Sequence, residues 1–333
     1  MSINFWMYAG FSIFILGTLA LDLGVFHRKA HVVRPKEAGI WIAVWASLAF
    51  AFAAILFVWR GHQHALLFAT GYLVELSLSA DNVFVIVMLF AYFRVPDKYQ
   101  HRVLFWGILG ALVMRGGFIG MGAWLIQKLD WVLYVFGAFL IFTGIRMAMR
   151  QDEEFDAERN IVLRTARRFL RVTTQYSGQK FFTKEAGLTV ATPLFLVLLL
   201  VEFTDLVFAV DSIPAIFAVT TDPFLVYTSN VFAILGLRSL YFLLAGVVYK
   251  FIYLKYGLAA ILTFVGVKML IVDFYHVPIY ISLGFILLAL ASTIAASFMF
   301  PIAPKDVIDE AQGKTGSIFG SVQPKNLRRR EET

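Results

Sequence analysis

Residues 205–212 read Asp-Leu-Val-Phe-Ala-Val-Asp-Ser, and residues 75–82 read Glu-Leu-Ser-Leu-Ser-Ala-Asp-Asn. Each stretch has an acidic residue, then five residues, then an aspartate that is followed by a small polar residue. Both lie inside long apolar runs, where a carboxylate costs about 2.5–3.5 kcal/mol on scales of membrane insertion. Because carboxylates occur there twice in the same pattern, the sequence favours an internal repeat that builds a cation site.

The composition is typical of a membrane protein. Hydrophobic residues make up 60% of the chain, aromatic residues 16%, and the mean hydropathy is +0.77. Near-continuous apolar stretches such as 279–300 are typical of transmembrane helices, whereas the strands of a membrane barrel alternate in polarity. We therefore expect an all-α, polytopic membrane protein that contacts the lipid bilayer.

Apolar runs of about 17–25 residues, separated by charged or turn-rich breaks, predict about nine transmembrane helices. They cover residues 5–25, 38–59, 65–91, 102–125, 130–148, 188–218, 225–248, 256–273 and 278–300. Of the 29 Lys and Arg residues, 24 fall in segments on one side if the N-terminus is outside. The positive-inside rule thus predicts an outer N-terminus and a cytoplasmic C-terminus.

Several function classes are disfavoured by residues that the sequence lacks. The chain has no cysteine, so it can form no disulfide, thiolate metal site or thiol relay of its own. Gly313-Lys-Thr315 lacks the upstream glycine of a P-loop. The charge of +7 is spread over short segments between apolar runs, which indicates membrane orientation. We expect no enzyme, no cofactor and no nucleic-acid partner.

Further matches extend the repeat over three consecutive helices. Ala111-Leu-Val-Met-Arg115 resembles Ile234-Leu-Gly-Leu-Arg238, and Phe142-Thr-Gly144-Ile-Arg146-Met resembles Phe264-Val-Gly266-Val-Lys268-Met. Because each unit has an odd number of helices and their linker lies on one side, the second unit must be inverted relative to the first. Inverted repeats are an architecture of secondary transporters, whose sites lie near the bilayer midplane.

The resulting domain plan is one transmembrane domain with two soluble segments. Residues 1–300 form the transmembrane domain, in which the first two helices are peripheral. Residues 65–148 form repeat one, 188–273 repeat two, and 278–300 the last helix. Residues 151–187 are a cytoplasmic linker, and residues 304–333 are a cytoplasmic tail whose composition favours disorder.

The repeated stretches supply oxygen ligands that suit hard divalent cations such as Mg²⁺, Mn²⁺ or Ca²⁺. The candidate metal ligands are Glu75, Asp81, Asn82, Glu202, Asp205, Asp211 and Ser212. Pro214 cannot bond to the carbonyl of Val210, so that carbonyl is a further candidate at a helix break. The acids outnumber the basic residues inside the spans, so the excess needs a metal or protons, and proton-coupled exchange would use both states.

Three further charged residues are candidates for charge balance or gating, namely Asp22, Arg115 and Arg238. The two arginines have a structural alternative, because each could neutralise a buried carboxylate as an ion pair of the fold.

Three longer stretches resemble the TerC family, and most closely its Alx branch. They are Val74-Glu-Leu-Ser-Leu-Ser-Ala-Asp-Asn82, residues 208–224 and residues 230–241. The resemblance implies a bacterial inner-membrane protein that exports Mn²⁺, in a group that is linked by name to tellurium resistance and by older naming to redox modulation. It places the acidic membrane motifs of the family on Glu75, Asp81, Asn82, Asp205, Asp211 and Ser212.

Two hypotheses of different classes follow. In the first, the chain is a Mn²⁺ exporter in which Asp81 and Asp211 face each other across the pseudo-two-fold axis, and protons are a coupling ion that the carboxylates would allow. In the second, the chain transports nothing, the acids serve helix packing, and the 151–187 linker binds a partner in a stress response.

Overall fold

The computed structural model describes residues 3–21, 35–129, 131–149, 161–173, 175–185, 187–245 and 253–300. Ten helices dominate this part of the chain. They are α1 (Ile3–Leu21), α2 (Pro35–Arg60), α3 (His62–Tyr92), α4 (Asp97–Lys128), α5 (Val132–Met149), α6 (Ile161–Phe169), α7 (Pro193–Phe217), α8 (Pro223–Leu244), α9 (Leu254–Leu270) and α10 (Ile279–Met299). One hairpin, β1 (Phe182–Glu185) and β2 (Leu188–Ala191), precedes α7. The all-α, polytopic fold class is confirmed.

Each of the nine expected spans overlaps one observed helix. Seven of the described helices are long and apolar enough to cross a membrane by length and composition, and α1 and α9 are shorter apolar helices. The remaining helix, α6, has nine residues. The prediction for the sixth span needs one correction, because 188–191 is a β-strand and α7 begins only at Pro193.

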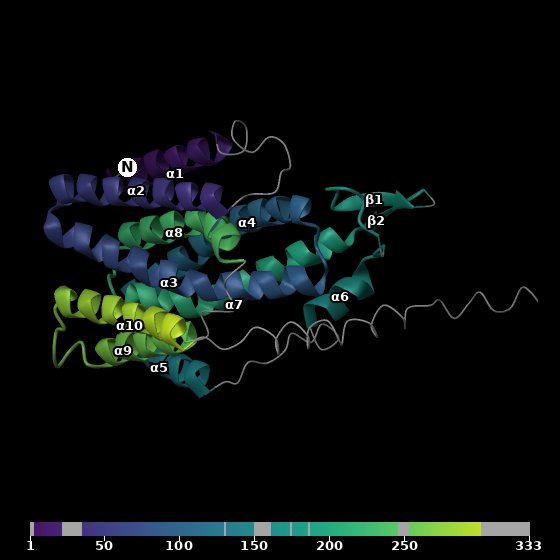
Figure 1. The fold of residues 1–333 in the computed structure, drawn as a ribbon. Coiled ribbons are helices and arrows are strands. Elements are labelled where there is room, and N and C mark those ends of the chain that lie inside the picture. The colour runs from purple at the N-terminus through teal and green to yellow at the C-terminus, as the bar shows by residue number, and fades with distance from the viewer. Residues whose placement is uncertain are drawn as a thin grey trace, which may run out of the picture.

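The helices form three layers (Figure 1). The first two helices lie along one side of the bundle, α5, α9 and α10 lie along the opposite side, and α3, α4, α7 and α8 fill the space between them. Phe11 of α1 and Trp45 of α2 are buried against Phe224 and Phe232 of α8. The central layer is thus shielded by apolar helices, as a site for ions in a bilayer requires.

Glycines allow the closest helix contacts. A Cβ atom on Gly266 of α9 would lie 2.6 Å from the carbonyl oxygen of Gly137 on α5, and one on Gly137 would lie 2.9 Å from the carbonyl oxygen of Gly266. Thus α5 packs on α9, while α3 packs on α8 and α4 packs on α7. In an inverted repeat, the α4–α7 pair would be the counterpart of the α3–α8 pair, and the repeat itself stays an interpretation of the sequence motifs.

The described part of the linker, which includes α6 and β1, lies at one end of the bundle, where α6 packs on α7 (Figure 1). The hydroxyl of Tyr176 donates a hydrogen bond of 2.8 Å to the carbonyl of Phe93, just after α3. Burial raises the pKa of Tyr176 to about 12, so this donor keeps its proton at physiological pH. The Arg102 guanidinium of α4 lies over the ring of Phe181. Residues 151–160 and the tail 304–333 lie outside the described residues.

Candidate functional site

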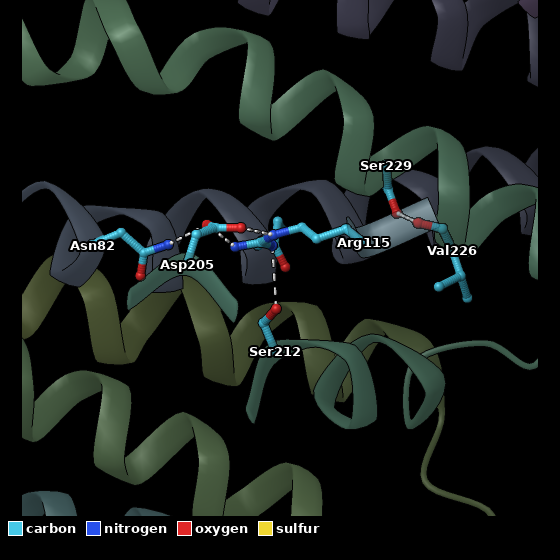
Figure 2. Close-up of polar contacts among 7 residues, drawn as sticks. Asn82, Arg115, Asp205, Ser212, Val226 and Ser229 are labelled. Carbon is cyan, nitrogen blue, oxygen red and sulfur yellow. Dashed lines mark hydrogen bonds and ion pairs between the residues drawn. The ribbon is translucent and has the colours of Figure 1, made fainter. Parts of the chain in front are cut away.

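Arg115 of α4 is the centre of a buried polar cluster. Its side chain donates to Asp205 twice, through Nε at 3.1 Å and through Nη2 at 2.9 Å, and its Nη1 donates to Ser212 at 3.2 Å. The same Nη1 also forms an ion pair with Glu75. Figure 2 shows Arg115 pointing at Asp205, with Ser212 below its guanidinium. One arginine therefore joins the acidic stretch of α3 to that of α7.

The helical repeat explains why these side chains meet. On α3, Glu75, Ser79 and Asn82 follow one another at i, i+4 and i+7 and are all buried. On α7, Asp205 and Ser212 stand seven residues apart and are also buried. The two stripes face each other directly, because Asn82 donates from Nδ2 to Asp205 over 3.4 Å.

A small cavity lies beside this cluster. Its volume is about 10 Å³, the space of one water molecule or one dehydrated ion. The polar lining consists of Asp81, Asn82, Arg115, Asp211 and Ser212. Both repeated aspartates thus reach one cavity, as the sequence hypothesis of facing aspartates requires. The apolar lining consists of Leu78, Met147, Phe208 and Leu262.

Two buried acceptor oxygens at the site have no hydrogen-bond partner among the described residues. They are Oε2 of Glu75 and Oδ1 of Asn82. The orientation of the Asn82 amide has a physical basis, because an ionised Asp205 accepts hydrogen bonds and the NH₂ group must face it. Leaving such an acceptor without a partner costs about 1–3 kcal/mol. The cluster is therefore suited to receive a proton, a water molecule or a cation.

The structure separates the candidate residues into groups. Glu75 and Asp205 do not line the cavity, but both are bonded to Arg115, which does. Glu202 lies one turn before Asp205, against Gly110 of α4, and does not line the cavity. Arg238 is buried elsewhere on α8, where its guanidinium lies 3.4 Å from Nε2 of His101. Asp22 lies outside the described residues.

The proline of the second stretch has a smaller effect than expected. Helix α7 continues through Pro214 and ends at Phe217, where the N–H of Ala218 donates to the carbonyl of Pro214 at 3.0 Å. The expected helix break is therefore not seen at Pro214.

Thr143 of α5 is a further residue of the site that was not predicted from the sequence, and its hydroxyl donates to Asp211 at 3.4 Å. The sequence did contain an indication of this residue, because Thr143 belongs to the repeated Phe142-Thr-Gly144 motif. Among the described residues, no three His, Asp or Glu side chains are close enough to form a metal cluster. The acids that line the cavity are Asp81 and Asp211, so a cation there would also need the Asn82 and Ser212 oxygens or water.

Comparisons with known proteins agree with this architecture. The model of the integral membrane protein TerC family matches residues 60–303. A Myxococcus xanthus protein named uncharacterized membrane protein STKORF319 is 53% identical over 293 residues, which cover 88% of this chain and 92% of that protein. An Escherichia coli K12 protein named provisionally as a membrane-bound redox modulator, Alx, is 53% identical over 288 residues, which cover 84% and 89%.

A third relative is more distant. An uncharacterized membrane protein of Rickettsia bellii is 41% identical over 295 residues, which cover 89% of this chain and 96% of that protein. No solved structure matches the chain. The family model and these relatives span most of the sequence, so the chain belongs to the TerC family of integral, multi-pass membrane proteins.

Proposed function

We propose that this protein is a secondary transporter that exports divalent cations, above all Mn²⁺, across the bacterial inner membrane. The observation that carries the proposal is the shared cavity of Asp81 and Asp211. These residues occupy equivalent places in two acidic stretches that lie 130 positions apart, yet both line one space of about 10 Å³. Carboxylates inside a membrane bundle mark ion pathways by default.

The chemistry of the lining supports a hard cation. Asp81 and Asp211 supply carboxylate oxygens, Asn82 an amide oxygen and Ser212 a hydroxyl oxygen. Such ligands suit Mn²⁺, Mg²⁺ and Ca²⁺, whereas softer metals favour thiolates, which this chain lacks. Within that group, Mn²⁺ and the direction of export follow from the family resemblance.

Charge balance gives Arg115 a defined place in the mechanism. The guanidinium is bonded to Glu75 and Asp205, so it offsets their charge next to the cavity. Loss of the cation would leave charge inside the bundle, and protonation of carboxylates would compensate for it. Proton exchange is the coupling that we propose.

The test compares cellular manganese in a manganese-sensitive strain that expresses matched variants. We expect Asp81→Asn and Asp211→Asn each to abolish protection and to raise cellular Mn²⁺ to the level of the empty vector, because each removes a charged ligand. Asp273→Asn is the control, because it makes the same change at an exposed position after α9. Full protection by both cavity variants at equal protein level would exclude the proposal.

A second candidate function is a non-transporting partner in a stress response. It is favoured by the name redox modulator given to the E. coli relative and by the docked linker, whose Arg164 and Arg168 are exposed. Replacing both arginines by glutamate distinguishes the two candidates. The transporter predicts unchanged metal efflux and protection, whereas loss of the stress phenotype with intact efflux would favour the partner.

A further inference from the structure

Glu202 is an acidic residue of α7 that stands apart from the cavity. It lies three residues before Asp205 and is half-buried. Its carboxyl group lies directly against Gly110 of α4, and a Cβ atom at that position would collide with both carboxyl oxygens. The neighbouring contact has the same form, because Gly107 faces Val201. The α4 backbone thus leaves room for this carboxyl group at the helix interface.

Glu202 differs from Asp205 in its partners. Asp205 accepts hydrogen bonds from Arg115 and Asn82. Glu202, by contrast, has no hydrogen bond or ion pair with any residue in the described part of the chain. An isolated carboxylate in an apolar setting is unfavourable and is stabilised by binding a proton.

The charged groups on the described helices around α7 do not provide Glu202 with a partner either. Acidic, basic and histidine residues with described side chains on the helices packed against it are His62, His64, Glu75 and Asp81 on α3, Asp97, Lys98, His101, Arg102, Arg115 and Lys128 on α4, Arg146 on α5, Arg164 and Arg168 on α6, and Lys255 and Lys268 on α9. The guanidinium of Arg115 is directed to Asp205, Ser212 and Glu75. On its own helix, the nearest acid to Glu202 is Asp205, which stands three residues further along and is bonded to Arg115.

We propose that Glu202 is the proton-binding residue of the exchange and is not a ligand of the metal. The inference rests on the proposed transport function and assigns its two ions to two places. The cation occupies the cavity of Asp81 and Asp211, and one proton binds the Glu202 carboxylate from one side of the membrane and leaves to the other. The link between them is Asp205, one turn from Glu202 and bonded to the arginine that lines the cavity.

Two assays of purified protein in proteoliposomes separate the roles. The first measures exchange of radiotracer manganese against unlabelled manganese at equal pH on both sides, which needs no net proton movement. The second measures manganese uptake driven by an acidic vesicle interior. We expect Glu202→Gln to retain exchange within about twofold and to lose at least about tenfold of driven uptake. Asp211→Asn should lose both activities.

Two further variants keep the test decisive if Glu202→Gln does not fold. Glu202→Asp retains a carboxyl group and should retain driven uptake with a shifted pH dependence. Gly110→Ala retains Glu202 but displaces its carboxyl group, and it should also shift that pH dependence while exchange stays unchanged. An unaltered pH profile in both variants would overturn the proposal.

The remaining outcomes are equally distinct. Loss of exchange in folded Glu202→Gln would make the residue part of the metal site, and full driven uptake in that variant would show that the proton binds elsewhere. Exchange without any driven uptake by the wild-type protein would overturn the proton role and leave transport standing. Absence of both activities from the wild-type protein would overturn the proposed function itself.

Discussion

At the residue scale, Arg115 connects the two acidic stretches that first indicated a site. Its guanidinium is almost fully buried and bonds Glu75 of one stretch and Asp205 and Ser212 of the other. From the sequence, Arg115 was a candidate for charge balance or gating, and helical spacing put the acidic and polar residues of each stretch on common faces. It could not predict that one arginine serves both acids, because the packing of α3, α4 and α7 depends on contacts between distant segments.

The first prediction concerns stability at this cluster. Arg115→Met leaves two buried carboxylates without their cation and should lower the free energy of unfolding by about 3–5 kcal/mol. The matched variant Arg60→Met breaks the ion pair with Asp222, whose partners are 30% and 25% exposed, and should cost at most about 1 kcal/mol. Thermal unfolding in detergent, followed by tryptophan fluorescence, measures the difference. Equal midpoints for the two variants would contradict the central role of Arg115.

At the element scale, the helices were predictable and the hairpin was not. Long apolar runs identify helices such as α2 and α10, because no other common element needs so many consecutive apolar residues. Leu188-Thr-Val-Ala191 continues the apolar run of α7, and four residues are too few for a period of two to be distinguished from helix. Only the pairing with Phe182–Glu185 shows it to be a strand. Thr143 was missed for a related reason, since its contact with Asp211 joins α5 to α7.

The second prediction concerns the contact of α5 with α9. Gly266→Ala places a methyl group 2.6 Å from the carbonyl oxygen of Gly137, a backbone atom that cannot turn aside, and should cost about 1–3 kcal/mol. Gly284→Ala is the control on α10, where a methyl group meets open space and helix propensity improves by up to about 1 kcal/mol. Unfolding midpoints in one detergent should move in opposite directions. A stabilised Gly266→Ala protein would refute the close α5–α9 contact.

At the scale of the whole molecule, the inverted pair of three-helix units stays an interpretation of the sequence motifs, and the helix pairings can be compared with it. A two-fold axis in the membrane plane would exchange the α3–α8 pair with the α4–α7 pair. It would map the α5–α9 pair onto itself. The Gly144 and Gly266 motifs, which the sequence matched to each other, both fall on the α5–α9 contact. The sequence could not predict which groups would line the cavity, because side chains of five helices meet there.

The third prediction is the orientation of the chain. The native sequence has no cysteine, so single substitutions can be labelled without background. Gln63→Cys before the first unit should react with a membrane-impermeant maleimide in intact spheroplasts. Lys184→Cys in β1 should react only after permeabilisation. The reverse pattern would place the N-terminus inside and contradict the orientation derived from positive charges.

Manganese movement itself tests the central claim most directly. Inverted inner-membrane vesicles with an acidic interior, prepared from cells that express the protein, should accumulate radiotracer manganese, because export from the cell becomes uptake into the vesicle. The Asp81→Asn, Asp211→Asn double variant should show only the uptake of vesicles without the protein, while Asp273→Asn should match the wild type. Equal accumulation by the wild type and the double variant would contradict the claim that these two aspartates form the transport site.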